Sequence, residues 1–266
     1  MLLRNKLFIT PTLATVIGTF VVITAAAILI IQALTSERVI RQLGGSLVDL
    51  GMDTSEAAFI EQLHAVTETA NYTRASWESG ELSFDDPEHL VGYIYGALAP
   101  QDRVSFMIMV DTAGMGVDVD RGDADGDILG GDVDLAADIP SLTPILEEAA
   151  NRQEPFWSEP LYMPTRKHTY FIYTHPFYSQ GTYRGSFLIG MSLERISDIT
   201  WSISTDDITV FLMKEKSEEV VAHPMLDDHF EELSAEAPLL HVSQISDFFL
   251  SDFSTLQIVE NKDYNI

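Results

Sequence analysis

Residues 12–34, TLATVIGTFVVITAAAILIIQAL, form an uncharged apolar run near the start of the 266-residue chain. A helix of this length spans about 34 Å, and the hydrocarbon core of a bilayer is about 30 Å thick. Arg4 and Lys6 precede the run, whereas the remainder of the chain is strongly acidic. Because basic residues collect on the cytoplasmic side, we predict a cytoplasmic tail at 1–11 and a transmembrane helix at 12–34. Residues after about 36 are then extracytoplasmic, and the protein lies in the plasma membrane.

A cleavable signal peptide is the alternative interpretation of this run. The apolar region of such a peptide normally has about 7–15 residues and ends in a small-residue cleavage site. The run at 12–34 is longer, and it continues into Thr35 and Ser36 without a convincing site. This favours an uncleaved signal anchor.

Composition limits the partners of the exported part. Without cysteine, the chain has neither disulfides nor thiol chemistry. The formal net charge of −26 argues against nucleic acid or an anionic membrane surface as a partner. A salty environment, in which acidic residues keep the surface hydrated, is another source of this charge. The exported part is large enough for one domain or two small ones with a hydrophobic core.

Apolar residues at helical spacing predict a long stalk helix over 35–80, with a break at Gly51. Its apolar seam steps by four, three, four and seven residues: Phe59, Leu63, Val66, Ala70 and Trp77. Such a seam packs on a second copy of the chain, giving a homodimer through the stalk helix, or on the sheet of its own domain. Both alternatives stay open at this point.

The rest of the chain reads as a mixture of helices and strands. Helices are expected over 86–99, 140–150 and 196–203, and strands over 104–110, 169–176, 185–193, 208–213 and 219–224, with an extended segment at 156–162. Paired antiparallel strands that follow helices predict an α+β fold, with one antiparallel sheet and flanking helices on one side of it.

An aspartate-rich stretch covers 116–138. Its eight aspartates are residues 118, 120, 123, 125, 127, 132, 134 and 138. The closest calcium-loop alignment puts Arg121 where the first carboxylate is needed and provides no glutamate as the twelfth ligand. We therefore expect a solvated acidic loop, with cation binding as the open alternative.

Catalytic motifs are missing from this sequence. The seven histidines form no helical metal-binding pair, and no nucleophile elbow, P-loop or dinucleotide fingerprint occurs. With 41 acidic residues a catalytic carboxylate pair stays open, but nothing selects one. We therefore name no catalytic residue, metal ligand or cofactor.

Three segments in the middle of the chain carry a family resemblance: 156–162 (FWSEPLY), 170–176 (YFIYTHP) and 185–193 (GSFLIGMSL). In this order they resemble the second half of a membrane-distal Cache module, a relative of the PAS fold. The segments 210–214 and 220–224 look like the start of the membrane-proximal module of a double-Cache sensor.

This resemblance implies a distal module at 81–203 and a partial proximal module at 204–266. It also implies the small-ligand sensor region of a bacterial transmembrane signalling receptor. Such receptors usually return through a second span, and a complete module needs nearer 100 residues than the about 60 that remain here. We therefore expect a chain that stops before that second span and before the output module.

The type of receptor is indicated by the stretch from His223-Pro to Leu250, which is similar to the sensor region of bacterial membrane adenylate/guanylate cyclases. Chemoreceptors, diguanylate cyclases and histidine kinases use the same module, so fold analogy leaves the output open. A membrane-anchored extracytoplasmic binding protein or hydrolase without signalling output is the alternative function.

Aromatic and basic residues suggest where a small ligand binds. The candidates are Trp157, Tyr162, Arg166, Tyr170 and Tyr173. Arg166 is suited to a two-pronged contact with a carboxylate, so a carboxylate or an amino acid is the expected ligand. Tyr170 and Tyr173 are three residues apart and face opposite sides of a regular strand, so at most one lines the pocket. The alternative is that the aromatic residues belong to the core and Arg166 is a solvated turn residue.

Overall fold

The computed structural model describes residues 57–122, 127–204, 209–214 and 217–245, apart from the side chains of residues 227 and 228. These residues belong to the unit Thr54–Ile266. The predicted tail, the span at 12–34, the first part of the stalk and residues 246–266 lie outside the described part. Every helix within the described part falls short of the length and apolar character that a bilayer crossing requires.

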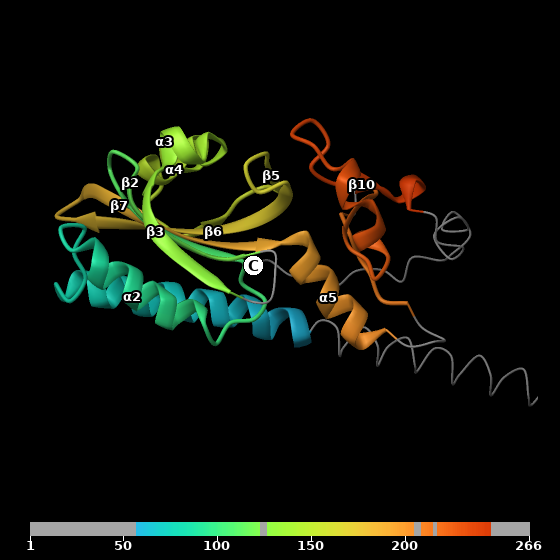
Figure 1. Cartoon of the computed structure of the whole chain (residues 1–266), viewed down its shortest axis with the longest axis horizontal. Helices are drawn as coiled ribbons and strands as arrows, with labels where there is room; N and C mark the ends of the chain where they lie inside the picture. Colours follow the sequence, from blue (N-terminus) through green and yellow to red (C-terminus); the bar gives the residue numbers. More distant parts are fainter. Residues whose placement is uncertain (1–56, 123–126, 205–208, 215–216, 246–266) are drawn as a thin grey trace, which may run out of the picture. The chain divides into compact units, whose positions relative to one another are not determined.

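A seven-stranded antiparallel sheet dominates the described part (Figure 1). Its order is β3-β2-β1-β7-β6-β4, and β5 also pairs with β6. The strands are β1 Phe106–Asp111, β2 Met115–Arg121, β3 Ile128–Asp134, β4 Phe156–Trp157, β5 Leu161–Met163, β6 His168–Ser179 and β7 Thr182–Ser192. Neighbouring strands follow one another in sequence except β6 and β4, which are separated by β5, and β1 and β7, where the chain crosses over to place two apolar strands in the centre.

Helices cover both faces of this sheet, so the central strands are apolar on both sides. On one face, Met107 and Met109 of β1 pack beneath the helix at 57–78 and α2 (Pro87–Leu98). On the other face lie α3 (Leu135–Asp138), η1 (Pro140–Leu142) and α4 (Thr143–Asn151), as Figure 1 shows. The α+β fold with an antiparallel sheet and flanking helices that the sequence predicts is thereby confirmed. The expectation that these helices lie on one side of the sheet is wrong, because strands that are apolar on both faces need helices on both.

The seam of the 57–78 helix packs on the sheet of its own domain. Val66 and Ala70 are buried in the core, and Phe59 and Trp77 pack against it. The ring of Trp77 stacks on Phe177 of β6, with ring centroids 4.9 Å apart. Of the two alternatives for this seam, the structure therefore favours packing within the domain over packing on a second copy.

Arg121 joins the end of β2 to the end of α2. Its guanidinium donates to the carbonyl oxygens of Leu98 at 2.7 Å, Gln101 at 3.0 Å and Val104 at 3.2 Å. It also donates to the carbonyl oxygen of Ala99 at 3.1 Å, so this arginine supplies a donor to four carbonyl groups at and after the end of α2, where the helix itself leaves carbonyl groups without partners.

A three-stranded sheet follows the first one. It has the order β10-β9-β8, and α5 (Leu193–Ile203) leads into it from β7. Its strands are β8 Leu212–Met213, β9 Glu219–Ala222 and β10 Leu240–His241, with the short helices η2 Leu226–Glu232 and η3 Val242–Gln244 beside them. These elements share a small apolar cluster, formed by Leu193, Val220, Leu226, Leu233, Leu239, Leu240 and Ile245.

A second sequence expectation about the fold is also wrong. The aspartate-rich stretch is not a loop over most of its length, because residues 115–121 and 128–134 pair as the hairpin β2–β3. Val117 and Val119 point into the core, while Asp118 and Asp120 alternate to the other face. Residues 123–126 lie outside the described part.

Candidate functional site

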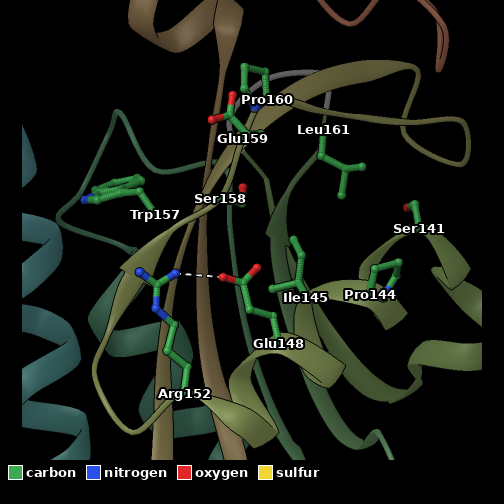
Figure 2. Close-up of a pocket in the computed structure, with 10 residues that line it drawn as sticks. All are labelled: Ser141, Pro144, Ile145, Glu148, Arg152, Trp157, Ser158, Glu159, Pro160 and Leu161. Atoms are coloured by element: carbon green, nitrogen blue, oxygen red, sulfur yellow. Dashed lines mark hydrogen bonds and ion pairs between the residues drawn. The ribbon is translucent and has the colours of Figure 1, made fainter.

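A pocket of about 400 Å³ lies between α4 and the segment that joins β4 to β5 (Figure 2). Its lining is Ser141, Pro144, Ile145, Glu148, Arg152, Trp157, Ser158, Glu159, Pro160 and Leu161. Five of these residues are consecutive, 157–161, and this stretch is called the wall segment below. The opposite side comes from η1 and α4.

The sequence of the wall segment explains why it stands away from the sheet. Ser158 pairs with Ile172 of β6, through its N–H at 2.8 Å and its Oγ, which accepts from the Ile172 N–H at 3.2 Å. Pairing resumes at Leu161, opposite Tyr170. Pro160 has no N–H to offer the ladder, so the chain bows out between these two points and forms a wall of the pocket.

Charged groups of both signs line the pocket. Arg152 Nη1 donates to Glu148 Oε1 at 2.7 Å, one helical turn away, and its guanidinium lies 4.7 Å from the centre of the Phe156 ring. Across the pocket, Lys214 Nζ donates to Glu159 Oε2 at 2.8 Å. Both ion pairs are exposed enough to exchange partners at little cost, since such pairs contribute about 0–1 kcal/mol. A ligand can therefore compete for these groups.

Arg166 is engaged within the protein. It follows β5, forms ion pairs with Asp118 and with Asp120 at 3.4 Å, and lies 4.4 Å from the centre of the Phe106 ring. Burial raises the pKa of Asp118, although the neighbouring Arg166 opposes this shift. The side chain is mostly buried rather than a solvated turn residue, and its guanidinium already has carboxylate partners.

The tyrosines fall on different surfaces. Tyr170 is buried edge-on against Phe106, with centroids 5.2 Å apart. Tyr173 is buried on the other face of the sheet, 5.1 Å from the Trp157 ring, which confirms the prediction that the two tyrosines face opposite sides. Tyr162 packs against the cluster of the three-stranded sheet.

The structure therefore does not gather the five predicted residues into one site. Of the five, Trp157 alone is among the residues that line the pocket. Arg166 and Tyr170 meet through Phe106 on the sheet face. As a ligand-binding set, the five residues stay a prediction.

Sequence reasoning missed the charged residues of α4. Glu148 and Arg152 stand four apart, a spacing that places two side chains on one face of a helix, and this signal was available near the end of the predicted 140–150 helix. Within the described ranges, no group of three or more histidine or acidic side chains is placed to hold a metal ion.

Comparison with known proteins gives similarity of structure alone. No protein-family model matches the chain, and no curated protein matches it either. Among solved structures, the chain is similar to the extracellular domain of a candidate histidine kinase, soHK1S-Z6, at 16% identity and a TM-score of 0.41. That match covers 52% of this chain and 58% of that domain, so the chain spans less than two thirds of its length.

Two chemoreceptor structures are also similar. The ligand-binding domain of the Campylobacter jejuni chemoreceptor Tlp3, in complex with 4-methylisoleucine, has 10% identity and a TM-score of 0.49, over 66% of this chain and 68% of that domain. Methyl-accepting chemotaxis protein X has 14% identity and a TM-score of 0.45, over 68% of this chain and 77% of the other.

Proposed function

We propose that residues 57–245 belong to the extracytoplasmic sensor region of a membrane signalling receptor and that a small molecule binds between α4 and the wall segment. The pocket is the observation that carries this proposal. Its volume of about 400 Å³ lies within the range of about 300–1,000 Å³ for small-molecule sites. Its lining combines apolar side chains with a few polar groups, as such sites do.

Amino acids and small carboxylates are the ligand classes that we propose. The Arg152 guanidinium can exchange Glu148 for a ligand carboxylate, because a guanidinium binds carboxylates through two parallel hydrogen bonds. The carboxylates of Glu148 and Glu159 can accept hydrogen bonds from a ligand ammonium group. Apolar contact comes from Pro144, Ile145 and Leu161, and Trp157 borders the pocket with a ring that packs on Tyr173.

A thermal-unfolding screen of the purified chain against these ligands tests the site. A ligand at 100 times its Kd stabilises the folded state by about 2.7 kcal/mol. Trp157→Ala should weaken the shift for all ligands of the pocket, and Arg152→Gln should weaken it for ligands that carry a carboxylate. Trp201→Ala is the matched control, because Trp201 is 68% exposed on α5 and does not line the pocket. A shift that neither pocket substitution weakens would place the ligand elsewhere.

A sensor outside the cell needs a route through the membrane, and we propose the apolar run at 12–34 for it, with residues 1–11 in the cytoplasm. Fusions of alkaline phosphatase and of a cytosolic reporter at Gly80, just after the 57–78 helix, test this orientation. Phosphatase activity together with a silent cytosolic reporter is expected. The opposite pattern contradicts the topology.

We further propose that 81–203 is the distal Cache module and that 204–266 begins the proximal one. The output module is a chemoreceptor, histidine kinase, diguanylate cyclase or adenylate/guanylate cyclase domain, and the stretch from His223-Pro is what supports the cyclase. A homodimer of this receptor would pair through a surface other than the seam, because Val66 and Ala70 are buried in their own domain.

A further inference from the structure

We infer that occupation of the pocket is transmitted to the three-stranded sheet through the wall segment and the residue after it, Tyr162. This inference rests on the proposed function and adds the route by which the site acts. It follows from one short stretch of chain that lines the pocket and also contacts the neighbouring sheet.

On the pocket side, the wall segment is fixed at its ends and free in the middle. Ser158 and Leu161 are tied to β6 by backbone pairing, whereas Glu159 and Pro160 between them are outside the ladder. Leu161 also lines the pocket, so a ligand that packs against this wall acts on β5 directly as well as on the free middle of the segment. Figure 2 shows Glu159 and Pro160 together at the rim of the pocket.

On the other side, the same stretch of chain reaches the three-stranded sheet and its apolar cluster at two points, and β6 adds a third contact nearby. Glu159 accepts a hydrogen bond from Lys214, the residue that follows β8, at 2.8 Å. Tyr162 packs against the apolar cluster that holds Val220 of β9. At the start of β6, the ring of His168 lies edge-on to Phe230 of η2, with centroids 6.2 Å apart.

These contacts differ in strength, so they do not share the coupling equally. The Glu159–Lys214 pair is exposed, with 86% of the Glu159 side chain accessible, and an exposed pair contributes little. Tyr162 is partly buried among apolar side chains and follows Leu161 within β5, a three-residue strand that, among the described strands, pairs with β6 alone, so a displacement of Leu161 reaches it directly. A ligand shifts an equilibrium only through contacts that differ between its two states, and the wall segment supplies such contacts. Tyr162 is therefore the main link, and Glu159 assists it.

The route can be tested without the natural ligand, because the chain has no cysteine. Ser141→Cys places a single thiol in η1, on the helix side of the pocket, where N-benzylmaleimide attaches a ring that fills part of the space. Amide hydrogen exchange then reports on β9 (Glu219–Ala222), with β1 as the internal reference for an intact core. Labelling should change the exchange rates of β9 by about fivefold or more, the lower end of allosteric coupling. The rates of β1 should stay constant.

Two substitutions identify the link. In Tyr162→Ala the response of β9 to labelling should vanish, and in Glu159→Gln, which alters only an exposed side chain, it should fall in part. Labelled Ala75→Cys, exposed on the 57–78 helix, is the matched control and should leave β9 unchanged. The inference is overturned if labelled Ser141→Cys does not alter β9, or if its effect persists in both substituted chains. A ligand screen without a hit would count against the proposed small-molecule site and would leave the labelling result as it stands. A ligand that binds in the pocket and leaves the exchange rates of β9 unchanged would overturn the inferred route to β9 and would leave the proposed site intact.

Discussion

Gly190 lies opposite Phe106, where the central strands β7 and β1 pair, and Gly190→Ala should destabilise the fold. A Cβ at residue 190 would stand 2.0 Å from Cε1 and 2.2 Å from Cζ of Phe106, so the ring would have to move. The ring has little room to do so, because it is fully buried, with Tyr170 at its edge and the Arg166 guanidinium over its face. The replacement therefore overpacks the interior between two strands.

Overpacking of this kind costs about 1–3 kcal/mol. For a domain of about 150–250 residues, each kcal/mol lowers Tm by about 2–4 °C, so the expected fall in Tm is about 2–12 °C. Gly96→Ala is the matched control, since Gly96 is exposed in α2 and nothing lies within 4 Å of an added Cβ. This control should raise the free energy of unfolding by about 0.5–1 kcal/mol, because alanine has the higher helix propensity.

Urea and thermal unfolding of the two variants provide the measurement. A second variant, Phe106→Leu, makes the assignment specific, because a smaller side chain at 106 leaves space for the new methyl group. Combined with Phe106→Leu, the cost of Gly190→Ala should shrink, and the double-mutant cycle should give a coupling energy of about 0.5–3 kcal/mol. A Gly190→Ala variant as stable as the original chain, or costs that simply add, would refute the packing argument.

Three further outcomes are expected. Burial lowers the pKa of His175, so its neutral form stabilises the fold fully above the ordinary histidine pKa of about 6.5, and this stabilisation is lost as pH falls through the lowered value. Between pH 7 and pH 5, the free energy of unfolding in urea should therefore fall less in His175→Phe than in the original chain. An equal fall would contradict this. Leu98→Ala removes a fully buried side chain of α2 and should lower the free energy of unfolding by about 2–5 kcal/mol, measured in urea. Arg166→Gln leaves the Asp118 carboxylate buried without its cation and should lower the free energy of unfolding by about 1–3 kcal/mol. Adding Asp118→Asn should recover part of that free energy, and a larger loss in the double variant would contradict the pairing.

Much of the fold follows from short-range patterns in the sequence. Asp86 and Pro87 predict the start of α2, and the Asp86 side chain accepts a hydrogen bond from the His89 N–H at 3.1 Å. The apolar run at 104–110 predicts the central strand β1 with both faces buried. Each of these signals lies within a few residues, where local propensity and periodicity decide the structure.

The β2–β3 hairpin escaped this reasoning because its composition favours loops. Aspartate and glycine are depleted in strands, and they make up much of 115–134. The alternation of valine and aspartate at 117–120 was the available signal, since a period of two indicates a strand with one buried face. Pairing with β1 then decides the conformation, and that contact is not local.

The candidate site was harder to foresee than the fold. Trp157 was identified, but its neighbours in the pocket include Ser141 and Glu148 from a separate helical segment, which no spacing rule connects to it. The Arg166 guanidinium is an ordinary turn cation by sequence, and only the register of β2 brings Asp118 to it across 48 residues. Sites of this kind depend on tertiary packing, which a sequence pattern alone does not specify.

The cap that Arg121 forms on α2 has a consequence for how this hairpin can change. In the calcium-loop alignment Arg121 stands at the first ligand position, so Arg121→Asp is the change that would bring the loop closer to a cation site. That replacement would also remove a side-chain donor from four backbone carbonyl groups, those of Leu98, Ala99, Gln101 and Val104, and put a negative charge at the negative end of a helix dipole. A gain of metal affinity is therefore tied to a loss of stability, and a compensating donor for the end of α2 would have to come first.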